Sequence, residues 1–203
     1  MAEKWTGANL GFNISIVTAL LLLPSLAWAH VEQGQAAGFF TGMEHPWSGL
    51  DHILAMIAVG LWGAQLGSPA LWVLPIAFPM MMTVGAMMGL MGIPVPGVEV
   101  GIALSAVLLG LMVLCEARPK LPISVMLVGF FAIFHGHAHG TELPPGQSGL
   151  LYSMGFVIGT GLLHGVGILI GLLHRFSFGR IVLRGAGAFI LGMGCFFFWQ
   201  AVT

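Results

Sequence analysis

The chain has 203 residues, of which 58% are hydrophobic and only 6% are charged, and its formal net charge is −1 at pH 7. An average soluble domain is about 25% charged, so this chain cannot cover the surface of a soluble enzyme, a nucleic-acid binder or a disordered regulator. With a mean hydropathy of +0.99, the composition predicts a polytopic membrane protein whose main partner is the lipid bilayer.

The first 29 residues have the three parts of a secretory signal peptide. Lys4 supplies the basic region, residues 14–23 are an apolar run, and a small-x-small cleavage site ends at Ala29. The run is shorter than the ~20 residues that span a bilayer, although an uncleaved anchor or an ordinary first helix is the alternative. Cleavage would leave residues 30–203 as one transmembrane domain. Its first residue, His30, either chelates a divalent metal with its α-amine and imidazole or only marks the processing site.

Six apolar segments follow, each close to the helix length that crosses ~30 Å of hydrocarbon. Helices satisfy every backbone group in lipid, and the alternating pattern of a membrane barrel is absent from the sequence. The chain is therefore predicted to be all-α, with six transmembrane helices. Three helices in each half suggest a 3+3 inverted arrangement, although the halves show no residue-level repeat. The segments are 50–67, 69–91, 97–115, 122–140, 148–173 and 181–202.

The basic residues of the mature chain fall in loops that would share one side of the membrane. Basic loops stay in the cytoplasm, so the mature N-terminus would be periplasmic, which agrees with the signal peptide. We expect a protein of the bacterial inner (plasma) membrane, with an acidic, histidine-rich mouth that attracts cations from the periplasm. The basic residues are Arg118, Lys120, Arg175, Arg180 and Arg184.

The first group of candidate metal ligands lies around the start of the first apolar segment. Histidine is poorly suited to facing lipid, so His45 and His52 need a reason to be there. Proline and glycine between them predict a bend before a helix that begins near Gly49 or Leu50. Asp51 and His52 would then occupy the first turn of that helix. The helix dipole favours an acid at this place, but this structural alternative does not account for the two imidazoles.

The second group lies at the outer end of the fourth segment. His135 and His139 are four residues apart, so both imidazoles share one helix face and can reach one metal ion. Glu142 lies three residues further on and can join that face. His137 points elsewhere unless the neighbouring glycines distort the helix. The alternative is a histidine-rich loop that only collects metal.

Imidazole together with carboxylate suits nickel, cobalt, zinc or ferrous iron, whereas magnesium and calcium prefer oxygen ligands. The metal would be a transported substrate, and no prosthetic group is expected. His164 interrupts the fifth segment toward its cytoplasmic half. It is either an inner relay for the ion, a proton acceptor, or a histidine hydrogen-bonded between helices.

At these residues the sequence resembles the HupE/UreJ family of nickel permeases. The resemblance covers essentially the whole mature chain. It implies a secondary transporter, not an enzyme, that brings nickel, or cobalt in some members, toward the cytoplasm for hydrogenase or urease assembly. It also implies that His45, Asp51, His52, His139 and Glu142 are functional, with His135 and His137 in the same motif. The matching motifs are His45-Pro46-x-x-Gly49-x-Asp51-His52, residues 54–62, and Phe134-His135-Gly136-His137-Ala138-His139-Gly140-x-Glu142.

Two functions remain open at this point. The first is a divalent-metal permease with a His/Asp/Glu site between the first and fourth helices. The second is an intramembrane zinc-dependent hydrolase, although the sequence has neither HExxH nor GxSxG. A nucleotide-binding GxxxxGK[ST] motif is also absent, so coupling to ATP would need a partner. A homo-oligomer is compatible with the sequence.

Overall fold

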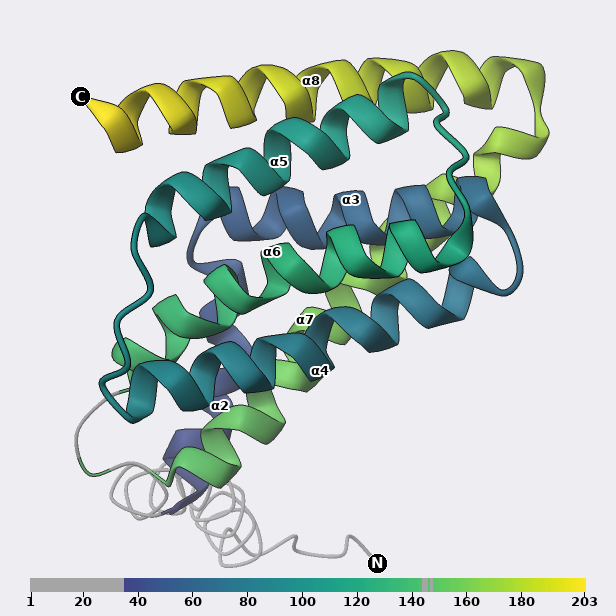
Figure 1. Cartoon of the computed structure of the whole chain (residues 1–203). Helices are drawn as coiled ribbons and strands as arrows, with labels where there is room; N and C mark the ends of the chain where they lie inside the picture. Colours follow the sequence, from purple (N-terminus) through teal and green to yellow (C-terminus); the bar gives the residue numbers. More distant parts are fainter. Residues whose placement is uncertain (1–34, 144–145, 147) are drawn as a thin grey trace, which may run out of the picture.

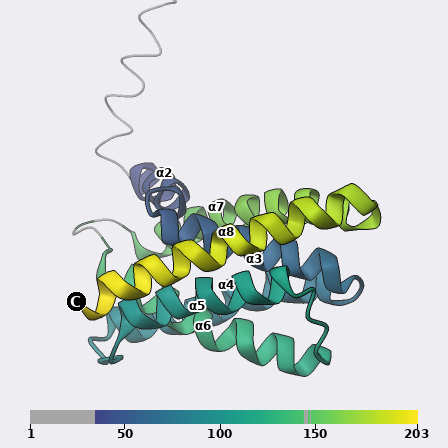
Figure 2. The same cartoon turned by 90° about the horizontal axis from the view of Figure 1, so that it is seen from above.

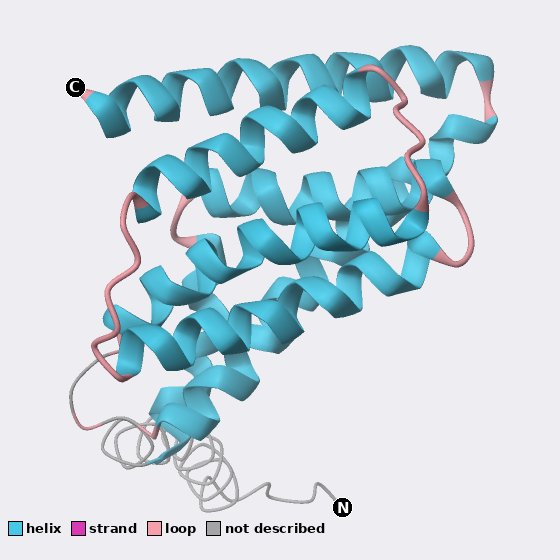
Figure 3. Ribbon diagram, viewed as in Figure 1, coloured by secondary structure: helices cyan, strands magenta, loops and turns pink. Residues whose placement is uncertain are grey.

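The computed structural model describes residues 35–143, 146 and 148–203, so the predicted signal peptide and His30 lie outside the described residues. Within these ranges the regular structure is helical (Figure 3), which confirms the all-α prediction. The elements are α2 (Gln35–Glu44), the 3-10 helix η1 (His45–Trp47), α3 (Leu50–Leu66), α4 (Ala70–Leu90), α5 (Val98–Leu114), α6 (Leu121–Thr141), α7 (Gly149–Gly171), the 3-10 helix η2 (Leu172–Arg175) and α8 (Ser177–Val202).

Each of the six predicted apolar segments contains a helix. Among the described residues, four helical stretches are long and apolar enough to cross a membrane: α4, α6, α7 with η2, and α8. The bent pair formed by α2–η1 and α3 is a fifth candidate. Helix α5 has 17 residues, which at 1.5 Å per residue gives about 25 Å, somewhat less than a hydrocarbon core of ~30 Å. The chain therefore has four to five candidate spans, and the count of six stays a prediction.

The bend predicted before α3 is present and is sharp. The helical axis turns by 80° between residues 38–47 and α3, and α3 begins at Leu50 after the extended residue Gly49. Helix α2, which precedes the bend, was not predicted. Its backbone packs on α7, where Gly155 and Gly159 leave room for the carbonyl oxygens of Phe39 and Met43. A short helix that depends on this contact carries little signal in its own sequence.

The helices run between two chemically different ends of the bundle. The α3–α4, α5–α6 and α7–α8 connections lie together at the right of Figure 1, and the described basic residues belong to that side. We call it the basic end and the opposite side the acidic end. In packing, α4 pairs chiefly with α6, α5 with α8 and α3 with α7, while α2 stands beside α7 at one side of the bundle (Figure 2).

Glycine controls how closely α4 and α6 approach each other. A Cβ atom at Gly85 would collide with the Ile133 carbonyl, and one at Gly140 would collide with the Ala86 carbonyl. Small residues at such positions let helix backbones touch in a membrane protein. This contact sets α6, which carries the second group of candidate ligands, against the middle of α4 and the part of α4 nearest the acidic end.

Replacing Gly85 with alanine should destabilise the bundle, because the new methyl group meets backbone that cannot rotate away. Overpacking of this kind costs about 1–3 kcal/mol, which should lower the Tm of the detergent-solubilised protein by a few degrees. Gly161→Ala is the matched control, since nothing among the described residues lies within 4 Å of a Cβ at that position. Equal Tm values for the two variants would contradict this account of the α4–α6 contact.

Candidate metal centre

Four imidazole rings from three separate elements meet near the acidic end of the bundle. Ring centroids are 4.7 Å apart for His45 and His139, 4.5 Å for His139 and His52, and 4.8 Å for His52 and His135. Metal–nitrogen bonds are about 2.0–2.1 Å long, so neighbouring rings at this spacing can bind a common ion. We call these four residues, with Asp51 and Glu142, the histidine cluster.

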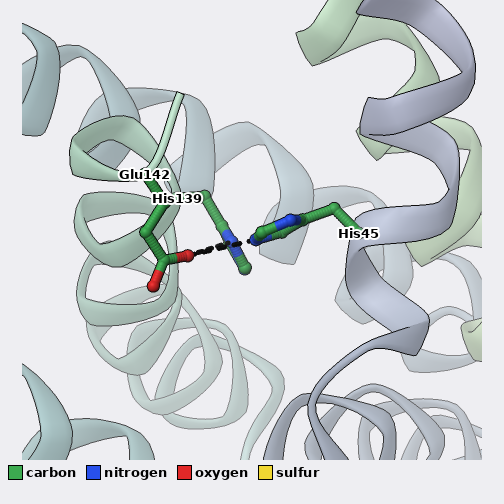
Figure 4. Close-up of side chains that lie close together, drawn as sticks. All are labelled: His45, His139 and Glu142. Atoms are coloured by element: carbon green, nitrogen blue, oxygen red, sulfur yellow. Dashed lines mark hydrogen bonds and ion pairs between the residues drawn. The ribbon is translucent and has the colours of Figure 1, made fainter. Parts of the chain in front are cut away.

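The outer part of the cluster joins the two sequence motifs across the bend. His45 of η1 donates from Nε2 to Glu142 Oε2 at 3.1 Å, although the residues are 97 positions apart. His139 Nδ1 lies 3.6 Å from the same carboxylate oxygen. One ligand atom from each of the three residues lies within 4.8 Å of the others, and Figure 4 shows His45 reaching across to the end of α6. These three residues are one candidate metal site.

The Asp51 carboxylate orients the imidazole of His52. Asp51 Oδ1 accepts hydrogen bonds from the backbone N–H of His52 at 2.9 Å and from its ring Nδ1 at 3.1 Å. With the proton on Nδ1, the buried Nε2 has a free lone pair, and no atom of the described residues hydrogen-bonds to it. A carboxylate that fixes the tautomer in this way is typical of histidines that bind metals.

Ser105 of α5 has the same effect on His135. The Ser105 hydroxyl donates to the Ile102 carbonyl at 2.6 Å, so its oxygen accepts a hydrogen bond from the N–H at His135 Nε2, at 2.9 Å. The other ring nitrogen, Nδ1, is then unprotonated and has no hydrogen-bond partner in the described part of the chain. Ser105 was not identified from the sequence, because the sequence around a serine in an apolar helix does not show which residue of another helix it contacts.

The two ends of the cluster differ in burial. The side chain of Glu142 is 55% exposed and that of His45 is 24% exposed, whereas His135 is fully buried. Contact with the His139 ring and the hydrogen bond from His45 lower the pKa of Glu142 to about 2, against the opposing effect of partial burial. Glu142 is therefore ionised at neutral pH and presents a negative charge at the open end.

The ligand set has the charge and chemistry of a site for one divalent transition-metal ion. Two carboxylates, Asp51 and Glu142, match the double positive charge, and neutral imidazoles supply nitrogen ligands of the kind that nickel, cobalt and zinc accept. Phe156 packs against His139 with ring centroids 4.3 Å apart. This apolar neighbour limits the access of water to the inner rings.

The structure leaves two described candidates outside the cluster. His137, which was among the candidate metal ligands, faces the α4–α5 connection and donates from Nε2 to the Ile93 carbonyl at 2.9 Å. His164 lies in α7, and its ring is separated from the cluster by Phe78.

A cavity leads to the cluster from the side of α5 and α8. It has a volume of about 200 Å³ and brings Glu99, at the start of α5, to the same space as Asp51. Glu99 therefore adds a further carboxylate to this approach. The remaining lining residues are Ala103, Phe197, Gln200 and Ala201.

Comparison with known proteins gives two matches. A family model described as "HupE / UreJ protein" matches residues 18–197, which include the whole histidine cluster. Protein HupE of Rhizobium leguminosarum bv. viciae is 45% identical to this chain over 175 residues, covering 86% of this chain and 91% of the relative. No solved structure matches the chain.

Metal binding by the purified protein should weaken on acidification, because protons compete for the imidazole nitrogens. Glu142, with a pKa of about 2, stays ionised well below the pH at which imidazoles ordinarily titrate, so its protonation is not the cause. We expect the affinity for nickel, measured by equilibrium titration, to fall steadily as the pH is lowered from about 7.5 toward about 4, because each nitrogen that binds a proton can no longer bind the ion. Glu142→Gln should bind less tightly but keep this dependence. Affinity that does not change with pH would show that imidazoles do not hold the ion.

Proposed function

This chain belongs to the HupE/UreJ family, and we propose that it carries nickel, or cobalt, from the periplasm to the cytoplasm through the histidine cluster. Proteins of this family are metal permeases rather than enzymes. The identity of the ion, the direction of transport and the residues that bind the ion are inferred from the chemistry of the chain itself.

The observation that carries the proposal is the convergence of four imidazoles and two carboxylates inside an apolar helical bundle. Ionisable residues within membrane segments are costly and mark ion pathways. Several buried imidazole nitrogens have no hydrogen-bond partner among the described residues; they belong to His52, His135 and His139. Burying a polar nitrogen without a partner in an apolar interior costs free energy unless a ligand binds to it. A passing metal ion is the ligand that this donor set fits.

We propose that the ion loses its water in steps as it moves inward along the cluster. Glu142 is the most exposed member of the cluster and, with His45 hydrogen-bonded to it, would meet the hydrated ion first. His139, placed between His45 and His52 by ring contacts on both sides, would pass it on to His52 and then to His135. Asp51 would hold the tautomer of His52 and contribute charge, a positioning role more than a direct ligand role.

The direction of transport follows from the distribution of charge. The basic end would face the cytoplasm by the positive-inside rule, and the histidine cluster would then lie near the periplasmic face of the inner membrane. Four acidic side chains of the described residues belong to the acidic end: Glu44, Asp51, Glu99 and Glu142. They would concentrate cations at this mouth, as charged clefts do for their substrates.

Nothing in the described part of the chain favours the zinc-dependent hydrolase. The cavity beside Asp51, at about 200 Å³, is smaller than the ~300–1,000 Å³ of typical small-molecule sites. It would admit an ion with its water molecules more readily than a lipid or peptide substrate.

Asp51→Asn and His52→Ala should each reduce nickel accumulation by cells that express the protein. The Asp51→Asn change keeps the size of the side chain but removes the charge and the strong acceptor that fix His52. Removing such a hydrogen-bond partner commonly costs 10–100-fold in metal affinity or activity, so we expect a loss of roughly that size. The measurement is uptake of radioactive nickel, normalised to the amount of protein in the membrane.

His174→Ala provides the matched control, since this histidine lies at the basic end and bonds through Nδ1 to the Gly171 carbonyl at 3.0 Å. It should accumulate nickel at the wild-type rate. The proposed pathway would be contradicted if Asp51→Asn and His52→Ala, each expressed at the wild-type level, both took up nickel at the wild-type rate.

A further inference from the structure

A second group of buried polar atoms without partners among the described residues lies on α7, deeper in the bundle than the histidine cluster. The His164 side chain is almost completely buried, and neither ring nitrogen has a hydrogen-bond partner there. Thr160, one helical turn earlier, is also fully buried, and within the same described ranges its hydroxyl has no partner either.

The absence of a partner for Thr160 within the described chain is unusual for a helical threonine. A threonine hydroxyl in a helix ordinarily bonds back to the carbonyl four residues earlier. Residues four apart share one face of a helix, with Cβ atoms about 5–6 Å apart. The Thr160 hydroxyl and the His164 imidazole therefore belong to the same inward face of α7, and both have polar atoms free to bind a ligand.

Helix α4 adds a carbonyl oxygen that has lost its usual donor. Pro75 and Pro79 both lie inside this helix, and Pro79 has no N–H to donate to the Pro75 carbonyl one turn before it. The Pro75 carbonyl lies beside the His164 ring, although the geometry falls short of a hydrogen bond. The buried His164 ring thus faces an oxygen that α4 itself does not use.

This group continues directly from the histidine cluster. The Phe78 ring lies between the two sets, with its centroid 5.5 Å from that of His135 and 5.6 Å from that of His164. On the other side, Gly60 of α3 allows close contact with the His164 carbonyl, which fixes this part of α7 inside the bundle. From His164, α7 continues to Gly171, a distance of about 10 Å toward the basic end.

We propose that His164, Thr160 and the Pro75 carbonyl form a second, weaker binding station for the transported divalent ion, one step inward from the histidine cluster. This inference rests on the proposed function, since it assumes that an ion leaves the cluster toward the basic end. One imidazole and two neutral oxygens bind a transition-metal ion less tightly than four imidazoles and two carboxylates. A weaker inner site would help the ion to leave the cluster, because a transported ion must be bound strongly enough to enter and weakly enough to leave.

A cysteine in place of His164 can report directly whether the ion reaches this position. The native cysteines, Cys115 and Cys195, are exposed and free, so both would first be changed to serine. Cobalt added to the purified His164→Cys protein should then produce the near-ultraviolet charge-transfer absorption of a thiolate–cobalt bond. Leu162→Cys is the matched control, because this position on the same helix is 54% exposed and should show no such band.

Transport and binding should separate in the His164→Ala variant. We expect at least a roughly tenfold lower rate of nickel uptake into proteoliposomes, while the Kd of the tightest nickel site, in the histidine cluster, stays within about twofold of wild type. A residue needed only for folding would instead lower the amount or the Tm of the protein and would not produce the cobalt–thiolate band in the cysteine variant.

The outcomes distinguish this inference from the function it rests on. If the wild-type protein neither binds nor transports nickel, the proposed function itself fails. The second station is overturned, and the proposed function stands, if the wild-type protein transports nickel and two further results are found. The first is that His164→Ala transports nickel at the wild-type rate. The second is that His164→Cys gives no charge-transfer band although cobalt occupies the histidine cluster.

Discussion

The site depends on one kind of interaction: a hydrogen bond that holds a proton on the far nitrogen of an imidazole, so that the near nitrogen is free to bind metal. Asp51 does this for His52 and Ser105 does it for His135. In the apolar interior an unpartnered nitrogen is unfavourable, and it persists only because the packing around it is rigid. The two carboxylates then balance the charge of a divalent ion that has left water.

The helical bundle brings these groups together from distant parts of the sequence. The 80° bend before α3 places His45 near the end of α6, where it meets Glu142. The glycine contacts between α4 and α6 hold the second motif against the core. Gly60 similarly lets α3 and α7 touch at the level of His164. Close backbone contact keeps the interior of the bundle narrow, so an ion that moves through it must replace its coordinating water molecules with side-chain ligands.

Much of this arrangement could be predicted from local patterns in the sequence. Hydropathy located the helices, the proline and glycine before Leu50 located the bend, and the spacing of four residues placed His135 and His139 on one face while turning His137 away. These features depend on residues within one or two helical turns of each other. The family resemblance, which the comparisons confirm, also follows from these local motifs.

The rest depends on contacts between helices, which no local pattern encodes. Helix α2 is set by glycines of α7, far along the chain, and the role of Ser105 exists only because α5 passes beside His135. The group around His164 depends on an α4 carbonyl that a proline leaves without a donor. The count of six spans stays a prediction because α5 is short and α3 qualifies only together with the bent segment before it.

The central claim is that imidazoles from both motifs bind one ion within the bundle. X-ray absorption spectroscopy at the nickel edge, on the purified protein loaded with one equivalent of nickel, tests it most directly. The account predicts the multiple-scattering signature of more than one imidazole, reduced in His52→Ala and in His139→Ala alike. A nickel shell of water and carboxylate oxygens alone, unchanged in both variants, would contradict it.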